Sequence, residues 1–302
     1  MASSMCMAAK KGEQMNITEE YSKHCESKGI RFQLDDTVCP YDETTLFCPA
    51  GMQQFKKKFS SEDVGTLANI QSCIRLKDLD EIGDGTHFLY FDMMGLFSFR
   101  ELTVQQAVDF WMEFVEDVLK IKVDYVTIHP DKMNDWKGLY DNYDVEIRAD
   151  EECTWTDGQI GGYCTEFFKD DVEIGNIVNP LGTCIDVGFG LQRLNMFANE
   201  VVEQSREDIL IEACEKLVYS GYYPSNKEQG YVFRKLLREL YRLQSTWDNE
   251  HYLKEKQRQD KVLKRYSKDK KKAKYQDKSK EWWFDTMGVD IDFIESLNLE
   301  DE

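Results

Sequence analysis

The sequence predicts an α+β fold, in which an antiparallel sheet flanked by helices is followed by a smaller helical domain. Short segments rich in β-branched and aromatic residues alternate with long helical patterns as far as about residue 200. Beyond that point the strand patterns stop and amphipathic helices take over. The 302 residues, 41% of them hydrophobic, are enough for one principal domain and a smaller appendage.

The chain is expected to begin with a flexible leader over residues 1–15, because this stretch is polar and has no periodicity. A short helix is predicted from Thr18 to Lys28, followed by an extended run in TTLFC. Strand patterns then occur in SCIR and HFLYFDMMG. Thr103 is predicted to cap the next helix, whose core-facing stripe consists of Val104, Val108, Trp111, Val115 and Val118.

The next stretch is predicted to complete the sheet and lead into helices. Strand patterns occur in VDYVTIH, VEIRA and VEIGNIV, with the Gly-rich TDGQIGGYCTEFF between the last two. A strand-to-helix junction is predicted in IDVGFGLQR, and two more helices in REDILIEACEKLVYSG and GYVFRKLLRELYRL. We therefore expect a sheet domain over residues 16–203 and a helical domain over residues 204–302.

Composition argues against several classes of protein. The nine cysteines are an odd number, are scattered and form no CxxC pair, so neither a disulfide framework nor a zinc site is indicated. The four histidines show no HxxxH or HExxH spacing, which argues against a histidine-based hydrolase. No segment has the length and apolar character of a membrane helix or a secretory signal. A soluble, cytoplasmic protein is expected.

The charge of the chain is strongly uneven. The net charge of −19 argues against indiscriminate binding to nucleic acid. Residues 252–280, however, carry 13 Lys and Arg against 4 Asp and Glu, so one segment concentrates the cationic surface. This segment is interpreted either as a contact with phosphates or as a solvated charged helix.

Two arginines and two glycines suggest a phosphate site, although no Walker sequence is present. Arg75 ends the strand pattern SCIR, and Arg193 ends the junction IDVGFGLQR that contains Gly188 and Gly190. A guanidinium offers a planar fork of donors that suits phosphate oxygens, and the glycines allow the backbone to approach a ligand. Each arginine taken singly is also compatible with a surface or salt-bridged residue.

Taken together, the segments described above resemble those of one known protein family. Residues 17–244 resemble alanyl-tRNA synthetases in the order and spacing of FCPAGMQQFK, SCIR, HFLYFDMMGLFSF, GYCTEFF, EIGNIV, IDVGFGLQRL and PSNKEQGYVFRKLLR, and FDTMGVDID resembles a later segment of that family. The resemblance implies a class II synthetase-type sheet, with ATP and Mg²⁺ as cofactors. The basic segment 252–280 would then belong to a helical tRNA-recognition domain.

The resemblance implies roles in ATP binding for five residues. Arg75 matches the motif 2 arginine that holds the α-phosphate and the amino-acid carboxylate, and Arg193 matches the motif 3 arginine on the terminal phosphate. Phe91 matches the aromatic residue on which adenine stacks. Glu173 matches a magnesium-associated carboxylate, and Gly190 belongs to the same ATP site.

The resemblance also implies an amino-acid pocket. Asp186 matches the carboxylate that pairs with the substrate ammonium, since a desolvated cation needs a compensating charge. The remaining pocket residues are Met52, Trp155, Asn176, Val178 and Gly188. Met52, Trp155 and Val178 match apolar walls that leave space for one methyl group, which favours alanine and admits glycine and serine.

For tRNA the resemblance implies recognition of the acceptor stem. Asn226 in PSN and Asp285 in FDT match a pair that reads a G–U base pair. PSN is equally compatible with a turn and helix cap. Lys264, Arg265 and Lys271 in the basic segment are expected to lie along phosphates.

The sequence departs from the family pattern in three places. The loop after Arg75 is reduced to LKDLDEIG where the family has a longer Gly- and His-containing loop, which puts transfer to tRNA in question. Gly175 replaces a tryptophan, so a roomier pocket is expected. The chain ends at residue 302, without the family's editing and C-terminal domains, so a monomer without proofreading is expected.

The sequence therefore predicts a ligase that activates alanine, or a similar small amino acid, with ATP and transfers it to the 3′ end of a tRNA. One alternative is the same adenylation with a different acceptor, such as a carrier protein, a small amine or a modified nucleic acid. A second alternative is a catalytically silent tRNA-binding paralogue. The presence of both arginines and Asp186 argues against the silent paralogue, because a decaying site is expected to lose at least one of them.

Overall fold

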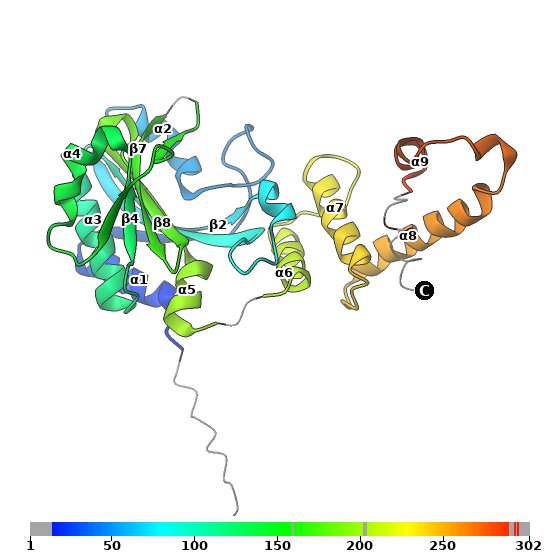
Figure 1. The fold of residues 1–302 in the computed structure, drawn as a ribbon, viewed down its shortest axis with the longest axis horizontal. Coiled ribbons are helices and arrows are strands. Elements are labelled where there is room, and N and C mark those ends of the chain that lie inside the picture. Colours follow the sequence, from blue (N-terminus) through cyan, green and yellow to red (C-terminus); the bar gives the residue numbers. More distant parts are fainter. Residues whose placement is uncertain (1–13, 159, 202–203, 290–292, 294, 296–302) are drawn as a thin grey trace, which may run out of the picture. The chain divides into compact units, whose positions relative to one another are not determined.

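The structure is a computed structural model and describes residues 14–289 except 159 and 202–203, together with 293 and 295; the side chain of Asp285 lies outside this description. The chain divides into two compact units, Met1–Gln204 and Ser205–Glu302. The first contains the whole sheet and the second is helical (Figure 1). Each unit is described by itself.

The first unit is built on a nine-stranded sheet. Eight strands follow the order β1-β2-β3-β9-β8-β7-β4-β5, and the ninth, β6, pairs with β7. The strands are β1 Arg31–Asp35, β2 Gly65–Ile74, β3 Tyr90–Phe99, β4 Tyr125–Ile128, β5 Glu146–Ala149, β6 Thr154–Thr156, β7 Gly161–Lys169, β8 Val172–Val178 and β9 Cys184–Gly190. The central pairings are antiparallel as predicted, but the pairings β1–β2 and β4–β5 at the two edges are parallel. The sheet is therefore mixed rather than purely antiparallel.

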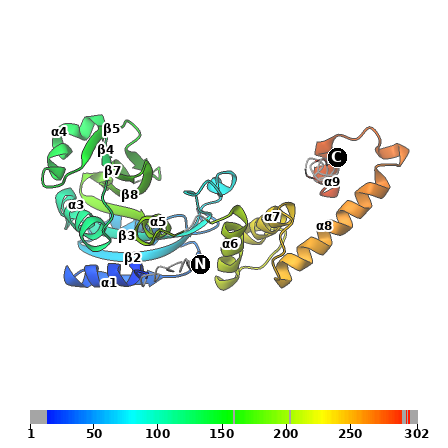
Figure 2. The same cartoon turned by 60° about the horizontal axis from the view of Figure 1, so that its bottom comes forward.

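Helices cover one face of this sheet and form the main core with it. They are α1 Ile17–Ser27, α3 Val104–Met112, which continues as a π-helix over Glu113–Val118, and α5 Leu191–Asn199. Figure 2 shows α1 lying along the sheet, where the hydroxyl of Tyr21 donates to the carbonyl of Gly95 in β3. The ring of Trp111 in α3 stacks on Phe189 in β9 at 4.0 Å between centroids. The helices predicted near residue 18 and after Thr103 are confirmed.

Thr103 begins α3 with a capping box. Its side chain accepts from the backbone N–H of Gln106, and the Gln106 side chain accepts from the backbone N–H of Thr103. This reciprocal pairing satisfies two amide groups that would have no partner within the helix, and it confirms the predicted cap.

The connections between strands differ from the predicted pattern at one point. TTLFC, residues 44–48, forms turns and no strand: the Asp42 carboxylate accepts from the backbone N–H of Thr44 at 2.9 Å, and Cys48 at its end bonds through its backbone to Val38 and Ile74. Such side-chain bonds favour a turn over an extended ladder. The segment AGMQQFKKKF that follows contains a 3₁₀ turn, Gly51–Phe55, and the short helix α2, Lys56–Phe59.

The second unit consists of α6 Arg206–Tyr219, α7 Glu228–Arg242, α8 Glu250–Asp269 and α9 Lys280–Met287. The two helices predicted between residues 206 and 242 are confirmed. Arg234 in α7 donates from Nε to Glu255 in α8 at 3.0 Å, and burial of Glu255 makes this ion pair a fixed contact between the two helices. Among the helices described in either unit, none has both the length and the apolar character needed to cross a membrane.

Candidate functional site

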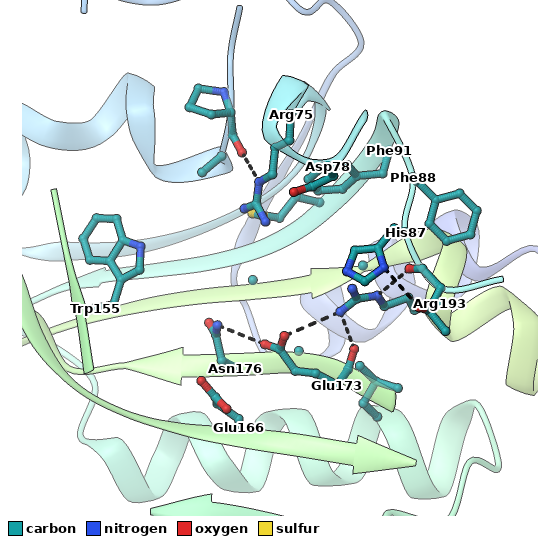
Figure 3. Close-up of a pocket in the computed structure, with 18 of the residues that line it drawn as sticks. Arg75, Asp78, His87, Phe88, Phe91, Trp155, Glu166, Glu173, Asn176 and Arg193 are labelled. Carbon is teal, nitrogen blue, oxygen red and sulfur yellow. Dashed lines mark hydrogen bonds and ion pairs between the residues drawn. The ribbon is translucent and has the colours of Figure 1, made fainter. Parts of the chain in front are cut away.

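A cavity of about 540 Å³ opens on the face of the sheet that the helices α3 and α5 leave uncovered. Figure 3 shows that its labelled side chains come from the end of β2 and the connection after it, from β3, β6, β7 and β8, and from α5. The residues predicted to bind ATP or amino acid all line it: Met52, Arg75, Phe91, Trp155, Glu173, Asn176, Val178, Asp186, Gly188, Gly190 and Arg193. The structure thus brings together residues that are up to 141 positions apart, between Met52 and Arg193.

Strand periodicity explains why the cavity residues of β9 and the end of β8 share one face, whereas Glu173 joins them across the register shift between β7 and β8. Val178 pairs with Asp186 and Asn176 pairs with Gly188 across the antiparallel strands β8 and β9. Alternate residues point to opposite faces of a sheet, so the residues between them, such as Ile177, point into the hydrophobic core instead. A shift of register by one residue would exchange the cavity and core faces.

Arg75 stands directly after β2 with its guanidinium partly fixed. Its Nε donates to the carbonyl of Pro49 at 3.0 Å, and the guanidinium carbon lies 4.9 Å from the centre of the Phe91 ring. Within the described part of the chain, its two terminal nitrogens donate to no partner. Arg75 therefore presents two charged donors to the cavity beside an aromatic face (Figure 3).

Arg193 lies in the first turn of α5 and is held by two backbone carbonyls. Its Nε donates to Thr86 at 3.2 Å, and its Nη1 donates to the Glu173 carbonyl at 2.6 Å. The same nitrogen lies 3.5 Å from the Glu173 carboxylate. Gly190 is the N-cap of α5 and has no side chain to satisfy the first helical N–H groups. These groups and Arg193 create a positive region suited to phosphate.

Glu173 and Asn176 supply oxygen atoms beside Arg193. The amide nitrogen of Asn176 donates to the Glu173 carboxylate at 3.3 Å (Figure 3). The amide oxygen of Asn176 accepts from no residue in the described ranges. Magnesium prefers carboxylate and carbonyl oxygens and usually takes one or two from the protein, so this pair fits the ion that Glu173 was predicted to hold.

Asp186 is a nearly buried carboxylate without a cationic partner. Only 8% of the residue is exposed, and in the parts of the chain that the structure describes it forms no hydrogen bond or ion pair through its side chain. Burial and the nearby charge of Asp157 raise the pKa of Asp186 to about 7. An uncompensated buried carboxylate is costly, and a cationic ligand would remove this cost. Asp186 is therefore suited to bind a positively charged group of a ligand.

The effect of Gly175 differs from the prediction. A Cβ atom built on Gly175 would lie 2.2 Å from the ring of Phe189, which is buried in the core. The space left by the missing side chain is therefore filled from the neighbouring strand, on the core side of the sheet. Gly175 lines the cavity, but the side chain it lacks would point toward Phe189, so this direction gives no support to the predicted roomier pocket.

Replacement of Gly175 by alanine is expected to destabilise the protein by about 1–3 kcal/mol, because the added methyl group overlaps the Phe189 ring and forces strain on the core. Urea denaturation measures this loss. Gly138→Ala is the matched control: its Cβ would have its nearest neighbour at 3.8 Å, and its stability should stay within about 0.5 kcal/mol of the parent. Equal stability of both variants would show that the core adapts around residue 175.

Several cavity residues were not predicted from the sequence. His87 lines the cavity and lies 2.6 Å from Asp84 through Nδ1 and 3.2 Å from Glu81 through Nε2. Glu166 lines it as well, and burial, followed by the charge of Glu173, raises its pKa to about 7. One pattern in the sequence could have indicated Glu166. It lies two residues after Cys164 in β7, and alternate residues of a strand point to the same face of the sheet.

The loop after Arg75 reaches the cavity, contrary to the expectation of a loop limited to LKDLDEIG. The connection from β2 to β3 spans residues 75–89, and its second part contributes Thr86, His87 and Phe88 to the cavity wall. The first part of this connection forms a 3₁₀ turn over Leu76–Asp80.

The residues predicted to bind tRNA lie in the second unit. Asn226 is exposed before α7, and its side-chain oxygen accepts from Arg234, which in turn pairs with Glu255. Lys264 and Arg265 are exposed on α8, and Lys271 is exposed just after it. Arg265 lies 3.5 Å from Asp269. The predicted role of Asp285 concerns a side chain outside the described residues.

Comparison with known proteins adds three findings. A family model described as tRNA synthetases class II (A) matches residues 16–218. Alanine–tRNA ligases of Francisella tularensis subsp. tularensis and Francisella philomiragia subsp. philomiragia are each 26% identical to the chain over 304 residues, covering 75% of this chain and 35% of the relative. The chain thus spans about a third of the length of these relatives.

Solved structures with partial similarity include S. aureus histidyl-tRNA synthetase, with a TM-score of 0.42 and 10% identity over 75% of this chain and 82% of that one. A pyrrolysyl-tRNA synthetase of Desulfitobacterium hafniense has a TM-score of 0.39 and 14% identity over 64% and 70% of the two chains.

Proposed function

Because the chain belongs to the class II (A) tRNA synthetase family, whose model spans residues 16–218, we propose that it activates a small amino acid with ATP and transfers it to the 3′ end of a tRNA. Alanine is the proposed amino acid, since the curated relatives are alanine–tRNA ligases. The observation that carries this proposal is Asp186, a buried carboxylate without a cation in a cavity that also holds Arg75 and Arg193.

The first step needs positioning rather than a protein nucleophile. The amino-acid carboxylate attacks the α-phosphorus of ATP, a new phosphorus–oxygen bond forms, and the bond to pyrophosphate breaks with the electrons passing to the leaving oxygen. Arg75 would hold the α-phosphate and the attacking carboxylate, since both terminal nitrogens of its guanidinium are available. Arg193 and the N-terminus of α5 would hold the departing phosphates.

Glu173 and Asn176 would hold a magnesium ion on the ATP phosphates. The ion supplies charge neutralisation of the phosphates when bound. The carbonyl of Glu173 accepts from Arg193 Nη1, so Glu173 would place its carboxylate beside the arginine that would hold the departing phosphates.

The amino acid would lie with its ammonium group at Asp186 and its side chain against Trp155, Met52 and Val178. These three residues line the cavity, and Met52 and Val178 are buried at 3% and 2% exposure. Apolar walls of this kind exclude larger side chains by size but discriminate weakly against glycine or serine. Alanine, glycine and serine are therefore the amino acids to compare first.

Neutralising exposed lysines of α8 and the segment after it should weaken binding to tRNA. Lys261, Lys264 and Lys271 are exposed and pair with no carboxylate in the described part of the chain. A Lys→Gln triple variant should bind tRNA about tenfold more weakly at low salt, with a flatter dependence of affinity on salt, because fewer counterions are released. Filter binding over a range of salt concentrations measures both effects.

The control for this variant removes the same charge elsewhere. Lys57, Lys120 and Lys137 are exposed on the first unit, and their triple Lys→Gln variant should keep most of the affinity and the original salt slope. If both variants lose the same affinity, the effect is one of net charge and the basic segment has no special contact with RNA.

Amino-acid-dependent ATP–pyrophosphate exchange, followed by charging of total tRNA, tests the proposed function. Exchange with alanine and formation of alanyl-tRNA are expected. Exchange with no amino acid would reject activation, whereas exchange without charging would favour a different acceptor.

A further inference from the structure

Two cysteines and a glutamate that are separated in the sequence meet at one edge of the cavity. Cys153 directly precedes β6, and Cys164 and Glu166 lie on the same face of β7. The antiparallel pairing of β6 with β7 places Cys153 opposite Cys164, whose backbone N–H donates to the Cys153 carbonyl at 3.0 Å. The two sulfur atoms and a Glu166 carboxylate oxygen lie within 4.8 Å of one another.

Hydrogen bonds join the side chains of this cluster, partly through the hydroxyl of Thr127. The Cys153 thiol donates to the Thr127 hydroxyl at 2.9 Å, and that hydroxyl donates to Glu166 at 3.4 Å. The Cys164 thiol lies 3.8 Å from the other Glu166 oxygen. Within the described ranges no lysine, arginine or histidine pairs with Glu166. A half-buried carboxylate beside two buried thiols thus lacks a cation, although carboxylates withdrawn from water are normally paired or bind metal.

We propose that Cys153, Cys164 and Glu166 bind a divalent cation of the zinc type. Two thiolates and one carboxylate are a set of ligands that zinc accepts, and thiolates select it over magnesium or calcium. Binding forms two sulfur–metal bonds and one oxygen–metal bond, and the two thiol protons pass to solvent. The sequence did not indicate this site, because the spacing of Cys153 and Cys164 is not CxxC and only the β6–β7 pairing brings them together.

Three protein ligands leave a fourth tetrahedral position for water or a ligand atom. Glu166 lines the cavity, whereas Cys153 and Cys164 are buried behind it at 0% and 2% exposure. The fourth position is therefore reached from the cavity side. Trp155, which packs against both cysteines and Val178, forms the adjoining wall of the cavity. The ion would tie β6 to β7 and so fix the position of Trp155.

Binding of Co²⁺ in place of zinc tests the proposal without any assay of activity. The reduced full-length chain is titrated with Co²⁺ and followed by absorption. Thiolate-to-cobalt charge transfer and the intense d–d bands of a tetrahedral ion are expected at one equivalent, and Zn²⁺ should displace the signal. Cys153→Ser and Glu166→Gln should weaken Co²⁺ binding by about 100-fold or more, since each removes a direct ligand.

The control is Cys184→Ser, which changes a buried cysteine of β9, a strand separated from β7 by β8, that lies outside the cluster. It should bind Co²⁺ as the parent does. Circular dichroism of every variant identifies misfolded protein. If a variant fails to fold, the Co²⁺ absorption of the parent chain still tests the proposal. Absence of thiolate charge transfer in the folded parent would overturn the proposal. Isolation of a Cys153–Cys164 disulfide that persists under the reducing conditions would overturn it as well.

Discussion

Asp186→Asn is expected to lower kcat/KM for amino-acid activation by at least about 1,000-fold while ATP binding changes by less than about threefold. The substrate ammonium loses its water in the cavity, and the Asp186 carboxylate is the negative charge placed to compensate it. Asparagine has nearly the same shape but no charge, so the loss reports the charge itself. Pyrophosphate exchange and titration with an ATP analogue give the two quantities.

Asp157→Asn is the matched control for this substitution. Asp157 is the charged neighbour that contributes to the raised pKa of Asp186, and its carboxylate lies 3.5 Å from Lys56. Removing its charge should leave activation within about threefold. If Asp186→Asn activates amino acids as well as the parent does, the assignment of the ammonium site is wrong.

The same carboxylate should destabilise the protein without ligand at neutral and alkaline pH. The pKa of Asp186 is about 7 in the folded protein, above the value of 3.8 for an unperturbed group. Between these two values the folded state holds a proton that the unfolded state releases, so stability falls as pH rises through this window. At pH 8 Asp186→Asn should therefore be more stable than the parent by about 2–4 kcal/mol.

At pH 4 the difference between Asp186→Asn and the parent should shrink to about 0.6 kcal/mol, since the carboxyl group is then protonated in the folded state and only partly ionised in the unfolded state. Urea denaturation of both proteins at the two pH values measures this change. A constant difference across the range would mean that Asp186 keeps an ordinary pKa.

Arg75→Lys should reduce the rate of activation by about 100-fold or more although the charge is retained. The Nε bond to Pro49 and the Phe91 ring fix the guanidinium so that both terminal nitrogens face the cavity. A lysine provides a single ammonium group and cannot reproduce this bidentate arrangement on phosphate and carboxylate oxygens. Because these oxygens gain charge in the transition state, kcat should fall more than KM rises.

Arg100→Lys provides the comparison for this variant. Arg100 also donates to backbone carbonyls, including that of Phe59 at 2.8 Å, but does not line the cavity. Its replacement should affect stability and leave the exchange rate within about threefold. An equal loss of rate in both variants would assign the effect of Arg75 to the fold.

Local patterns in the sequence predicted much of the sheet, because they depend on neighbouring residues alone. Thr103 and Gln106 form a capping box that can be read from four consecutive positions. Period 2 in β9 places Asp186, Gly188 and Gly190 on one face, and the structure places all three at the cavity. The ATP and amino-acid residues as a set were predicted from the family resemblance, and they meet because β9 pairs with both β3 and β8.

Features that depend on contacts between distant strands could not be predicted in this way. The parallel pairings of β1 with β2 and of β4 with β5 follow from chain connections that strand patterns do not encode. The ring of Phe189, which lies in the next strand and 14 residues later in the chain, fills the space beside Gly175. The sequence alone therefore could not show on which side of the sheet the missing side chain of Gly175 leaves room. Cys153 and Cys164 meet only through the register of β6 and β7.

Binding of two stable adenylate analogues tests most directly the claim that Asp186 receives the amine of a small amino acid. Alanyl-sulfamoyl-adenosine carries the ammonium group, and propionyl-sulfamoyl-adenosine lacks it but is otherwise alike. Calorimetry should show that the parent binds the alanyl compound about 100-fold or more tightly than the propionyl compound, and that Asp186→Asn abolishes this preference. Equal affinities of the parent chain for both compounds would contradict the proposed site.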